Sequence, residues 1–367
     1  MNGLAGKGFF IWKIQDCEGG NPRAIAESAQ RAGLTHVLIK IADGGWPVNM
    51  DRKTNTDLLP PVVQAIREKG IQVWGWHYVY GNDPLAEANV AIRRIQQFQM
   101  DGYVVDAEIE YKQAGKDRAA RRFMAKLRES LPALPMALSS YRFPSYHPQL
   151  PWKVFLEFVD YNMPQVYWEK AHNPEAQLRR SVREFQGMTP FRPVIPTGPT
   201  YKTGGWAPTE QDILEFLRTV QALQLSAVNF FSWDECRKQT PSLWEVISHF
   251  SWTPQPPPPD IVDLYFQALN LHDPSLILHL YHPDAVHITP ARVIQGSQAI
   301  RAWYTTLFND VLPRASFTLT HSTQSGSARH FNWTAQAGNT TVKNGADTIG
   351  IMDGKIAYHY TNFTISA

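Results

Sequence analysis

Eight short apolar runs alternate with amphipathic stretches along the first 250 residues, and this alternation limits the fold more than any other feature of the sequence. Such runs are typical of buried parallel strands, and the stretches between them have the apolar spacing of helices, so the pattern indicates repeated βα units. We expect strands at residues 9–14, 36–42, 72–80, 102–110, 136–141, 161–168, 193–197 and 227–233.

Eight βα units in about 240 residues are the usual content of a (β/α)₈ barrel. Several expected helices begin at the proline of an Asn-Pro or Asp-Pro pair, a common cap and first turn. An open doubly wound sheet is the alternative, but no glycine-rich phosphate loop follows the first run. The sequence therefore predicts a TIM barrel over residues 1–250, with helices at 22–32, 60–69, 84–99, 117–130, 174–185 and 210–223.

A second domain is expected after the barrel, since 367 residues exceed what one hydrophobic core usually serves. Residues 251–259, which end in a run of prolines, are predicted to form an extended linker. Beyond it, residues 260–367 show helical runs first and strand-like runs afterwards, with Asp353-Gly354 as a tight hairpin turn. This order favours a small α+β domain with a curved antiparallel sheet, its strands at residues 315–322, 330–336, 339–347, 348–353 and 355–364.

Composition narrows the classes of partner. A formal net charge of +2, without a basic stripe, argues against a nucleic-acid partner. The sequence has no run of about 18 apolar residues, which argues against a membrane span. The first seven residues leave no room for a signal peptide, so we expect a cytoplasmic protein, with export left open if a signal was removed.

Acidic residues cluster on the fourth expected strand. Because side chains alternate along a strand, Asp106, Glu108 and Glu110 share one face, and Val105, Ala107 and Ile109 share the other. We expect the acids to face the barrel axis at the carboxyl end of the strand, where barrel enzymes place their chemistry. Carboxyl groups this close raise each other's pKa, which suits a general acid.

The alternative is structural. Asp106 and Glu108 would then be held by a buried Lys or Arg, with Lys40 on the second expected strand as the obvious counter-ion. Glu110 is the least certain of the three acids, since it could already lie in the following loop.

The fourth strand resembles the D-G-x-D-x-D-x-E signature of family 18 chitinase-like glycoside hydrolases. Asp101, Gly102, Asp106 and Glu108 match it, whereas Val104 replaces the first inner acid. Most of the first 235 residues is similar to family 25 lysozymes: residues 36–44 to their second strand with its Lys, residues 73–78 to their third, and residues 105–108 to their D-x-E. The sequence departs from these lysozymes at two positions. Phe10 or Ile11 stands where they have an Asp on the first strand, and Trp76 stands where they have a Tyr on the third.

This resemblance implies a TIM-barrel glycoside hydrolase that retains the anomeric configuration with help from the substrate's 2-acetamido group. Glu108 would protonate the departing oxygen, and Asp106 would orient the acetamido nitrogen. Gln165 and Tyr167 would hydrogen-bond the sugar, and Trp233 would form an apolar floor. The substrate-binding set is completed by Glu110, Lys40, Trp76 and Tyr78, although packing is an alternative role for each aromatic residue.

Three loops after expected strands, residues 44–47, 142–147 and 203–206, should overhang the same rim, and each offers an aromatic side chain. Cys17 and Cys236 follow the first and last strands, which are neighbours in a closed barrel, so we expect them to be close, either free or bridged. His77 is interpreted as a buried histidine satisfied by a carboxylate rather than a catalytic group. No metal-binding spacing is present, so neither a metal nor a cofactor is expected.

The second domain resembles the cone-shaped SnoaL-like fold shared by nuclear transport factor, polyketide cyclases and ketosteroid isomerases. The resembling segments are residues 265–268, 281–286, 294–300 and 353–356. The resemblance implies an apolar pocket, lined by Trp303, Trp333, His287 and Tyr360, and a homodimer formed through the sheet. Packing is the alternative role for each of these four residues.

The leading hypothesis is a glycoside hydrolase acting on a glycan that contains N-acetylhexosamine, with peptidoglycan as one candidate. The second hypothesis is an inactive, glycan-binding barrel whose small domain serves as a dimeriser or a small-ligand pocket. A third places a cyclase-like or isomerase-like activity in the small domain.

Overall fold

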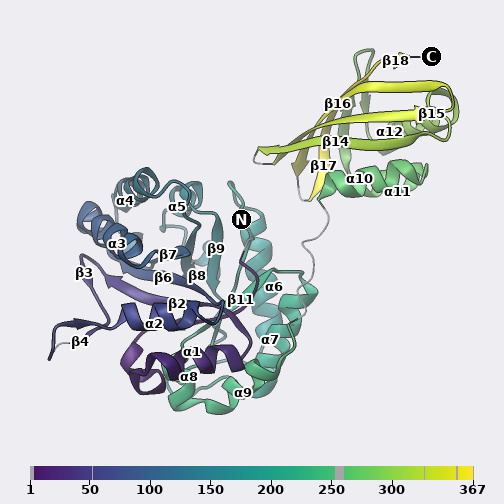
Figure 1. Cartoon of the computed structure of the whole chain (residues 1–367). Coiled ribbons are helices and arrows are strands. Elements are labelled where there is room, and N and C mark those ends of the chain that lie inside the picture. Colours follow the sequence, from purple (N-terminus) through teal and green to yellow (C-terminus); the bar gives the residue numbers. More distant parts are fainter. Residues whose placement is uncertain (1–3, 52, 253–259, 326, 353, 367) are drawn as a thin grey trace. The chain divides into compact units, whose positions relative to one another are not determined.

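The computed structural model describes residues 4–51, 53–252, 260–325, 327–352 and 354–366 (Figure 1). Residue contacts divide the chain into two compact units, Met1–Gln255 and Pro256–Ala367. Most of the predicted linker, residues 253–259, lies outside the described residues. No helix in the described ranges is long and apolar enough to cross a membrane.

The first unit is a closed barrel of parallel strands alternating with helices, which confirms the predicted (β/α)₈ fold (Figure 1). The ring closes because β1 pairs with β2 on one side and with β11 on the other. In order around the ring the strands are β1 (Gly6–Ile11), β2 (Leu34–Asp43), β6 (Gln72–Val79), β7 (Gly102–Ala107), β8 (Met136–Tyr141), β9 (Tyr161–Gln165), β10 (Thr197–Pro199) and β11 (Ala227–Phe231).

Helices surround this ring, and several begin where the sequence predicts. Asn21 and Asp83 cap α1 and α3 through side-chain oxygens that accept the Ala24 and Ala86 N–H groups, each at 3.1 Å. The helices are α1 (Pro22–Arg31), α2 (Leu59–Arg67), α3 (Pro84–Phe98), α4 (Lys116–Ser130), α5 (Trp152–Phe158), α6 (Pro174–Gln186), α7 (Glu210–Ala222), α8 (Trp233–Gln239) and α9 (Pro241–His249). A short hairpin strand, β3 (Trp46–Pro47), pairs with β2, and β4 (Met50–Asp51) pairs with β5 (Thr56–Asp57).

The barrel is packed on both faces of its strands. Outward side chains join the helices in one large core, and inward side chains fill the axis with a second, smaller cluster. Near the axis, His36 Nε2 and Asn229 Oδ1 form a buried hydrogen bond of 2.6 Å. Because the interior is filled in this way, a candidate site has room only at the end of the ring. The inward cluster includes Phe10, Leu38, Trp74, Trp76, Val104, Ala137, Met163 and Ile195.

The first strand of the barrel is hydrogen-bonded to the end of its last helix, α9. Lys7, on β1, donates from Nζ to the carbonyl oxygens of Ile247 at 2.7 Å, Ser248 at 3.2 Å and Phe250 at 2.9 Å. These carbonyls end α9 and have no partner within the helix, so the ammonium group satisfies them and favours their partial negative charge.

Several predicted strands have different bounds in the structure. The first spans Gly6–Ile11 instead of residues 9–14, the sixth ends at Gln165 instead of residue 168, and the eighth ends at Phe231 instead of residue 233. The fourth ends at Ala107 and is followed by a 3₁₀ turn, η3 (Ile109–Lys112), so the strict alternation stops before Ile109, which is 61% exposed instead of packed against helices. The seventh lies at Thr197–Pro199 instead of residues 193–197. Pro193 and Pro196 lack an N–H group for a strand ladder, and only Asn162 and Val194 form an isolated bridge there.

The second unit combines a curved sheet with helices α10 (Ile261–Asn270), α11 (Pro274–Leu280) and α12 (Ser297–Thr306), which confirms the predicted α+β plan (Figure 1). A π-helical turn, η5 (Leu307–Val311), follows α12. Along the sheet the strands are β13 (Val293–Gln295), β12 (Tyr281–Ile288), β17 (Lys355–Asn362), β16 (Thr340–Met352), β15 (Ala328–Ala337) and β14 (Ser316–Ser325), and β18 (Ile365–Ser366) pairs with β16. The sheet is mostly antiparallel, as predicted, but β12 and β17 pair in parallel.

Strand β16 is continuous, although the sequence predicts two runs that meet at Asp347 and Thr348. Met352 pairs with Lys355 at the turn between β16 and β17, and Gly354 has a φ of 73°. This agrees with the expected hairpin at Asp353-Gly354, although Asp353 itself lies outside the described residues.

Candidate functional site

The two predicted catalytic carboxyl groups meet one amide at the carboxyl end of the barrel strands. Gln165, the last residue of β9, donates from Nε2 to Asp106 Oδ1 at 3.1 Å and to Glu108 Oε1 at 2.8 Å. Asp106 is on β7, and Glu108 directly follows that strand. Gln165 also lies 3.4 Å from the Ser139 hydroxyl on β8. Strands β7 and β9, on either side of β8, thus bring Asp106, Glu108 and Gln165 together, as strand alternation predicts.

Lys40 forms no ion pair with these carboxyl groups, although its charge lowers the pKa of Asp106. Its Nζ lies 2.6 Å from Asp43 Oδ2, so the predicted counter-ion forms its ion pair on its own strand. The same Nζ lies 4.8 Å from the centre of the Trp76 ring and 5.3 Å from that of Trp12. Lys40 therefore belongs to an aromatic wall of the site, and the interpretation of Asp106 and Glu108 as a sealed ion pair with Lys40 is wrong.

Burial raises the pKa of both carboxyl groups. Asp106 is 6% exposed, and burial together with repulsion from Glu108 holds its pKa well above the usual value. Glu108 is partly exposed. Burial and the charge of Glu110 raise its pKa, whereas the hydrogen bond from Gln165 lowers it. Two interacting acids that share a donor titrate as a pair, and such a pair retains a proton at higher pH than an isolated carboxyl group.

Glu110 lies in the 3₁₀ turn η3, beyond the end of β7, and not on the strand. It nevertheless reaches the site, because its Oε2 accepts a hydrogen bond of 2.8 Å from the Tyr78 hydroxyl. Tyr78 in turn packs edge-on against Tyr80, with ring centres 5.2 Å apart. Trp76 lies deeper, where its indole N–H donates to the Ile11 carbonyl oxygen at 3.0 Å.

Trp233 does not form the floor of the site, which corrects the sequence prediction. Strand β11 ends at Phe231 and helix α8 begins at Trp233, so alternation no longer applies at that residue. Trp233 is fully buried in the outer core, with its ring centre 4.5 Å from that of Trp244. Phe231, which was not predicted, is the last inward residue of β11, and its ring centre lies 6.0 Å from that of Trp76 and 6.3 Å from that of Tyr167.

Other aromatic residues at this end of the barrel also escaped the sequence analysis. Trp12 directly follows β1, is 41% exposed and packs 6.1 Å from Phe231. Tyr141 ends β8, and burial, together with the charges of Glu108, Glu110 and Asp106, raises its pKa to about 12. Alternation along the fifth predicted strand puts Ser139 and Tyr141 on one face, and would have identified both.

The three predicted rim loops differ in the exposure of their aromatic side chains. Trp46 is 77% exposed on β3, and Tyr146 is exposed beside Arg180, whose guanidinium carbon lies 4.4 Å from its ring centre. Trp206 is buried and donates its indole N–H to the Ala171 carbonyl oxygen at 2.8 Å. Two loops therefore offer an aromatic surface, and the third packs down onto the barrel.

The other barrel residues considered in the sequence, two cysteines and one histidine, are buried. Cys17 and Cys236 are buried and free, so the bridged alternative is wrong. Each thiol contacts a carbonyl oxygen of its own segment, that of Lys13 and that of Thr240 respectively. His77 is buried, but its partners are the Tyr103 hydroxyl at 3.0 Å and the Gly44 carbonyl oxygen at 2.7 Å rather than a carboxylate.

No group of three or more His, Cys, Asp and Glu side chains is placed to hold a metal ion in the part of the chain that the structure describes.

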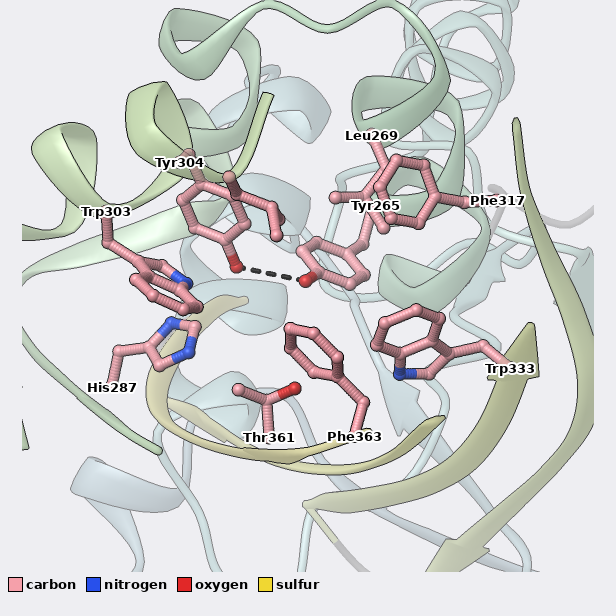
Figure 2. Close-up of a pocket in the computed structure, with 10 residues that line it drawn as sticks. Tyr265, Leu269, His287, Trp303, Tyr304, Phe317, Trp333, Thr361 and Phe363 are labelled. Atoms are coloured by element: carbon pink, nitrogen blue, oxygen red, sulfur yellow. Dashed lines mark hydrogen bonds between the residues drawn. The ribbon is translucent and has the colours of Figure 1, made fainter. Parts of the chain in front are cut away.

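A second candidate site lies inside the other unit (Figure 2). Three of the four predicted pocket residues, His287, Trp303 and Trp333, do line a small cavity. Tyr360 does not, because it neighbours Thr361 on β17 and side chains of successive strand residues point to opposite faces. The rest of the wall was not predicted from the sequence: Tyr265, Leu269, Tyr304, Leu307, Phe317, Thr361 and Phe363.

The comparisons with known proteins concern this second unit. Residues 262–359 match the family of SnoaL-like domains, and they form the curved sheet and helices described above. The C-terminal unit is a SnoaL-like domain. The family match does not include the barrel, and no curated protein matches the chain.

Solved structures similar to the SnoaL-like domain include an NTF2-like protein of unknown function from Cytophaga hutchinsonii. It is 12% identical, the match covers 29% of this chain and 88% of that chain, and the TM-score is 0.25. Another is an uncharacterized cystatin-fold protein from Novosphingobium aromaticivorans, at 13% identity, with 28% of this chain and 93% of that chain covered and a TM-score of 0.26.

Proposed function

We propose that the barrel is a retaining glycoside hydrolase acting on a glycan that contains N-acetylhexosamine. The observation that carries the proposal is the pair of carboxyl groups on Asp106 and Glu108, held by Gln165 at the carboxyl end of the strands. Lys40 forms its ion pair with Asp43 and not with either of these two groups, and Glu108 stays partly exposed. A carboxyl group that keeps its proton and faces solvent can donate that proton to a leaving group.

In this proposal Glu108 protonates the glycosidic oxygen as the bond to the anomeric carbon breaks. The acetamido oxygen of the substrate forms the new bond to that carbon, and Asp106 holds the acetamido N–H and balances its developing positive charge. Glu108, now ionised, then takes a proton from the water that opens this intermediate. Each face of the sugar is attacked once in turn, so the product retains the starting configuration.

The aromatic side chains support a sugar ligand. Phe231 packs against Trp12 and Tyr167 at the same end of the barrel, and Lys40 carries a charge over the Trp76 ring. Sugar rings have apolar faces that stack on aromatic side chains, and polar rims that need donors and acceptors such as Tyr78 and Glu110. A site that offers both kinds of residue therefore suits a carbohydrate better than a purely apolar ligand.

A direct test is incubation of the full-length chain with chitooligosaccharides, peptidoglycan and aryl N-acetylhexosaminides. We expect cleavage of at least one of these substrates, and proton NMR should show that the first product has the configuration of the substrate. Products of inverted configuration would contradict the substrate-assisted route. No cleavage and no binding across the set would contradict the function itself.

A second candidate function is glycan binding without hydrolysis. Phe10 favours it, because this aromatic side chain is buried in the barrel interior where the resembling lysozymes have a first-strand Asp. The same assay separates the two functions, since a binding protein would retain a glycan in affinity electrophoresis and release no reducing ends. The glycan as partner, like a homodimer through the second unit, remains a proposal.

The pH dependence of hydrolysis should respond to the neighbours of Glu108 in opposite directions. Glu110 raises the pKa of Glu108, so Glu110→Gln should move the alkaline limb of kcat/KM to lower pH. The Gln165 hydrogen bond lowers that pKa, so Gln165→Leu should move the limb to higher pH, together with a lower maximum. Shifts of the same sign in both variants would show that another group controls this limb.

A further inference from the structure

Trp12 combines a partly exposed side chain with a backbone that is hydrogen-bonded on both sides. It directly follows β1 at the carboxyl end of the barrel strands and is 41% exposed. Its N–H group donates to Asp234 Oδ1 at 3.3 Å, and its carbonyl oxygen accepts from Asn49 Nδ2 at 3.1 Å. Connecting segments usually move more than the strands they join. Two hydrogen bonds to side chains far along the sequence therefore restrain this residue where the chain would otherwise move.

Asn49 restrains Trp12 together with the segment that follows it. The same Nδ2 donates to the Lys40 carbonyl oxygen on β2 at 2.8 Å, and Oδ1 accepts from the Ile14 N–H group at 2.8 Å. Asn49 has a φ of 59°, in the left-handed region that asparagine enters more readily than most residues. One amide thus links the end of β1 to β2 through three backbone groups, and a side chain without both a donor and an acceptor could not make these contacts.

Asp234 restrains the N–H side of the same residue. It lies in the first turn of α8 and is buried, although a carboxyl group is costly to bury unless it is hydrogen-bonded. Single exposed apolar residues are common on protein surfaces. Trp12 differs from them because a buried carboxyl group and an amide hold its backbone while the residue stays partly exposed at the end of the barrel.

The Trp12 ring adjoins the candidate barrel site through two residues of that site. Its centre lies 5.3 Å from Lys40 Nζ and 6.1 Å from the centre of the Phe231 ring. Burial raises the pKa of Asp106 and the charge of Lys40 opposes that change, so Lys40 is within electrostatic reach of the acid pair. Trp12 thus belongs to the edge of the site, next to residues that surround the acids.

We propose that Trp12 stacks against the sugar next to the one whose bond is cleaved, which favours oligosaccharides and polymers over monosaccharide glycosides. This inference rests on the hydrolase proposed above. The C–H face of a sugar ring is apolar, and an indole ring offers it a large aromatic surface. The Lys13 ammonium group lies 5.6 Å from the ring centre, has no hydrogen bond or ion pair among the described residues, and can donate to hydroxyl groups of the same sugar. Asn49 and Asp234 are positioning residues, because they act through Trp12.

The test measures glycan binding by isothermal titration to the full-length Glu108→Gln chain, which lacks the proposed acid and therefore does not consume the ligand. We expect the tetrasaccharide of N-acetylglucosamine to bind more tightly than the monosaccharide. Adding Trp12→Ala should weaken tetrasaccharide binding about tenfold and leave monosaccharide binding unchanged. Phe191→Ala, a matched change of an aromatic residue that is 48% exposed between α6 and β10, should alter neither affinity.

The same titration tests the positioning residues. Asn49→Asp keeps the acceptor for Ile14 and loses the donor for the Trp12 carbonyl oxygen, so tetrasaccharide affinity should fall about threefold while monosaccharide affinity stays unchanged. Asp234→Asn keeps an acceptor for the Trp12 N–H group and should match the Glu108→Gln chain, whereas Asp234→Ala should resemble Asn49→Asp. Equal losses for both ligands would show a general structural role and overturn the assignment of the two residues.

The outcomes separate this inference from the hydrolase on which it rests. Unchanged tetrasaccharide affinity after Trp12→Ala would overturn the stacking role and leave glycan binding intact. Equal losses for the two ligands after this change would overturn the assignment to the neighbouring sugar. Glycan binding that depends on Trp12, without hydrolysis by the unchanged chain, would contradict the hydrolase alone. No glycan binding by the Glu108→Gln chain would overturn both proposals.

Discussion

Replacing Glu108 with glutamine is expected to lower kcat/KM for an N-acetylhexosamine oligosaccharide by about 10²–10⁴-fold, the usual contribution of a general acid. Glutamine keeps the shape of the side chain and can still accept the hydrogen bond from Gln165 Nε2, which now lies 2.8 Å from Glu108 Oε1. It cannot supply the proton that the departing oxygen needs. Steady-state kinetics on the purified variant measures the loss directly.

The leaving group offers an internal check on this prediction. A nitrophenyl group departs without much help from an acid, so Glu108→Gln should lose much less activity on an aryl N-acetylhexosaminide than on an oligosaccharide. Glu129→Gln, a matched change on the exposed side of α4, should retain full activity on both. Equal losses on both substrates would mean that Glu108 acts in some way other than protonating the leaving group.

Replacing Asp347 with alanine should destabilise the SnoaL-like domain by about 3–5 kcal/mol, the usual effect of breaking a buried polar pair. The carboxylate accepts three hydrogen bonds in a fully buried position, and the variant would leave the donors on Trp333, His359 and Thr361 without a partner. Buried donors without partners are destabilising whichever side chain remains nearby.

Hydrogen exchange read by mass spectrometry would measure this effect strand by strand. We expect faster exchange across β16 and β17 in Asp347→Ala and unchanged exchange in the barrel strands. Asp310→Ala, at an exposed position in η5, is the matched control and should match the unchanged chain. Uniform protection in both variants would show that the carboxylate network contributes little to folding.

Strand periodicity predicts the barrel site correctly only as far as the strands extend. Asp106 and Gln165 face the interior because both lie on strands, and Glu108 follows directly. The rule fails at Ile109 and at Trp233, since each lies beyond the last strand residue. Where a strand ends depends on hydrogen bonds to neighbouring strands, and local sequence does not contain that information.

Contacts between segments far apart in the sequence determine the roles of other residues, and sequence patterns do not reveal these contacts. Gly102, part of the acidic motif, has no room for a side chain, because a Cβ atom there would lie 2.4 Å from the Trp74 ring. The Asp347–His359 pair depends on the register of β16 against β17, where Asp347 stands opposite Thr361. A sequence pattern that divides β16 in two at this point cannot reveal that register.

The position of β1 has a consequence for synthesis of the chain. Its two neighbours are β2 and β11, so one edge of the first strand stays unpaired until Phe231 has left the ribosome. At 5–20 residues per second this wait lasts roughly 10–45 s. An apolar strand with a free edge invites pairing with other chains during that time. Nascent chains of this protein should therefore depend on chaperones until the barrel closes.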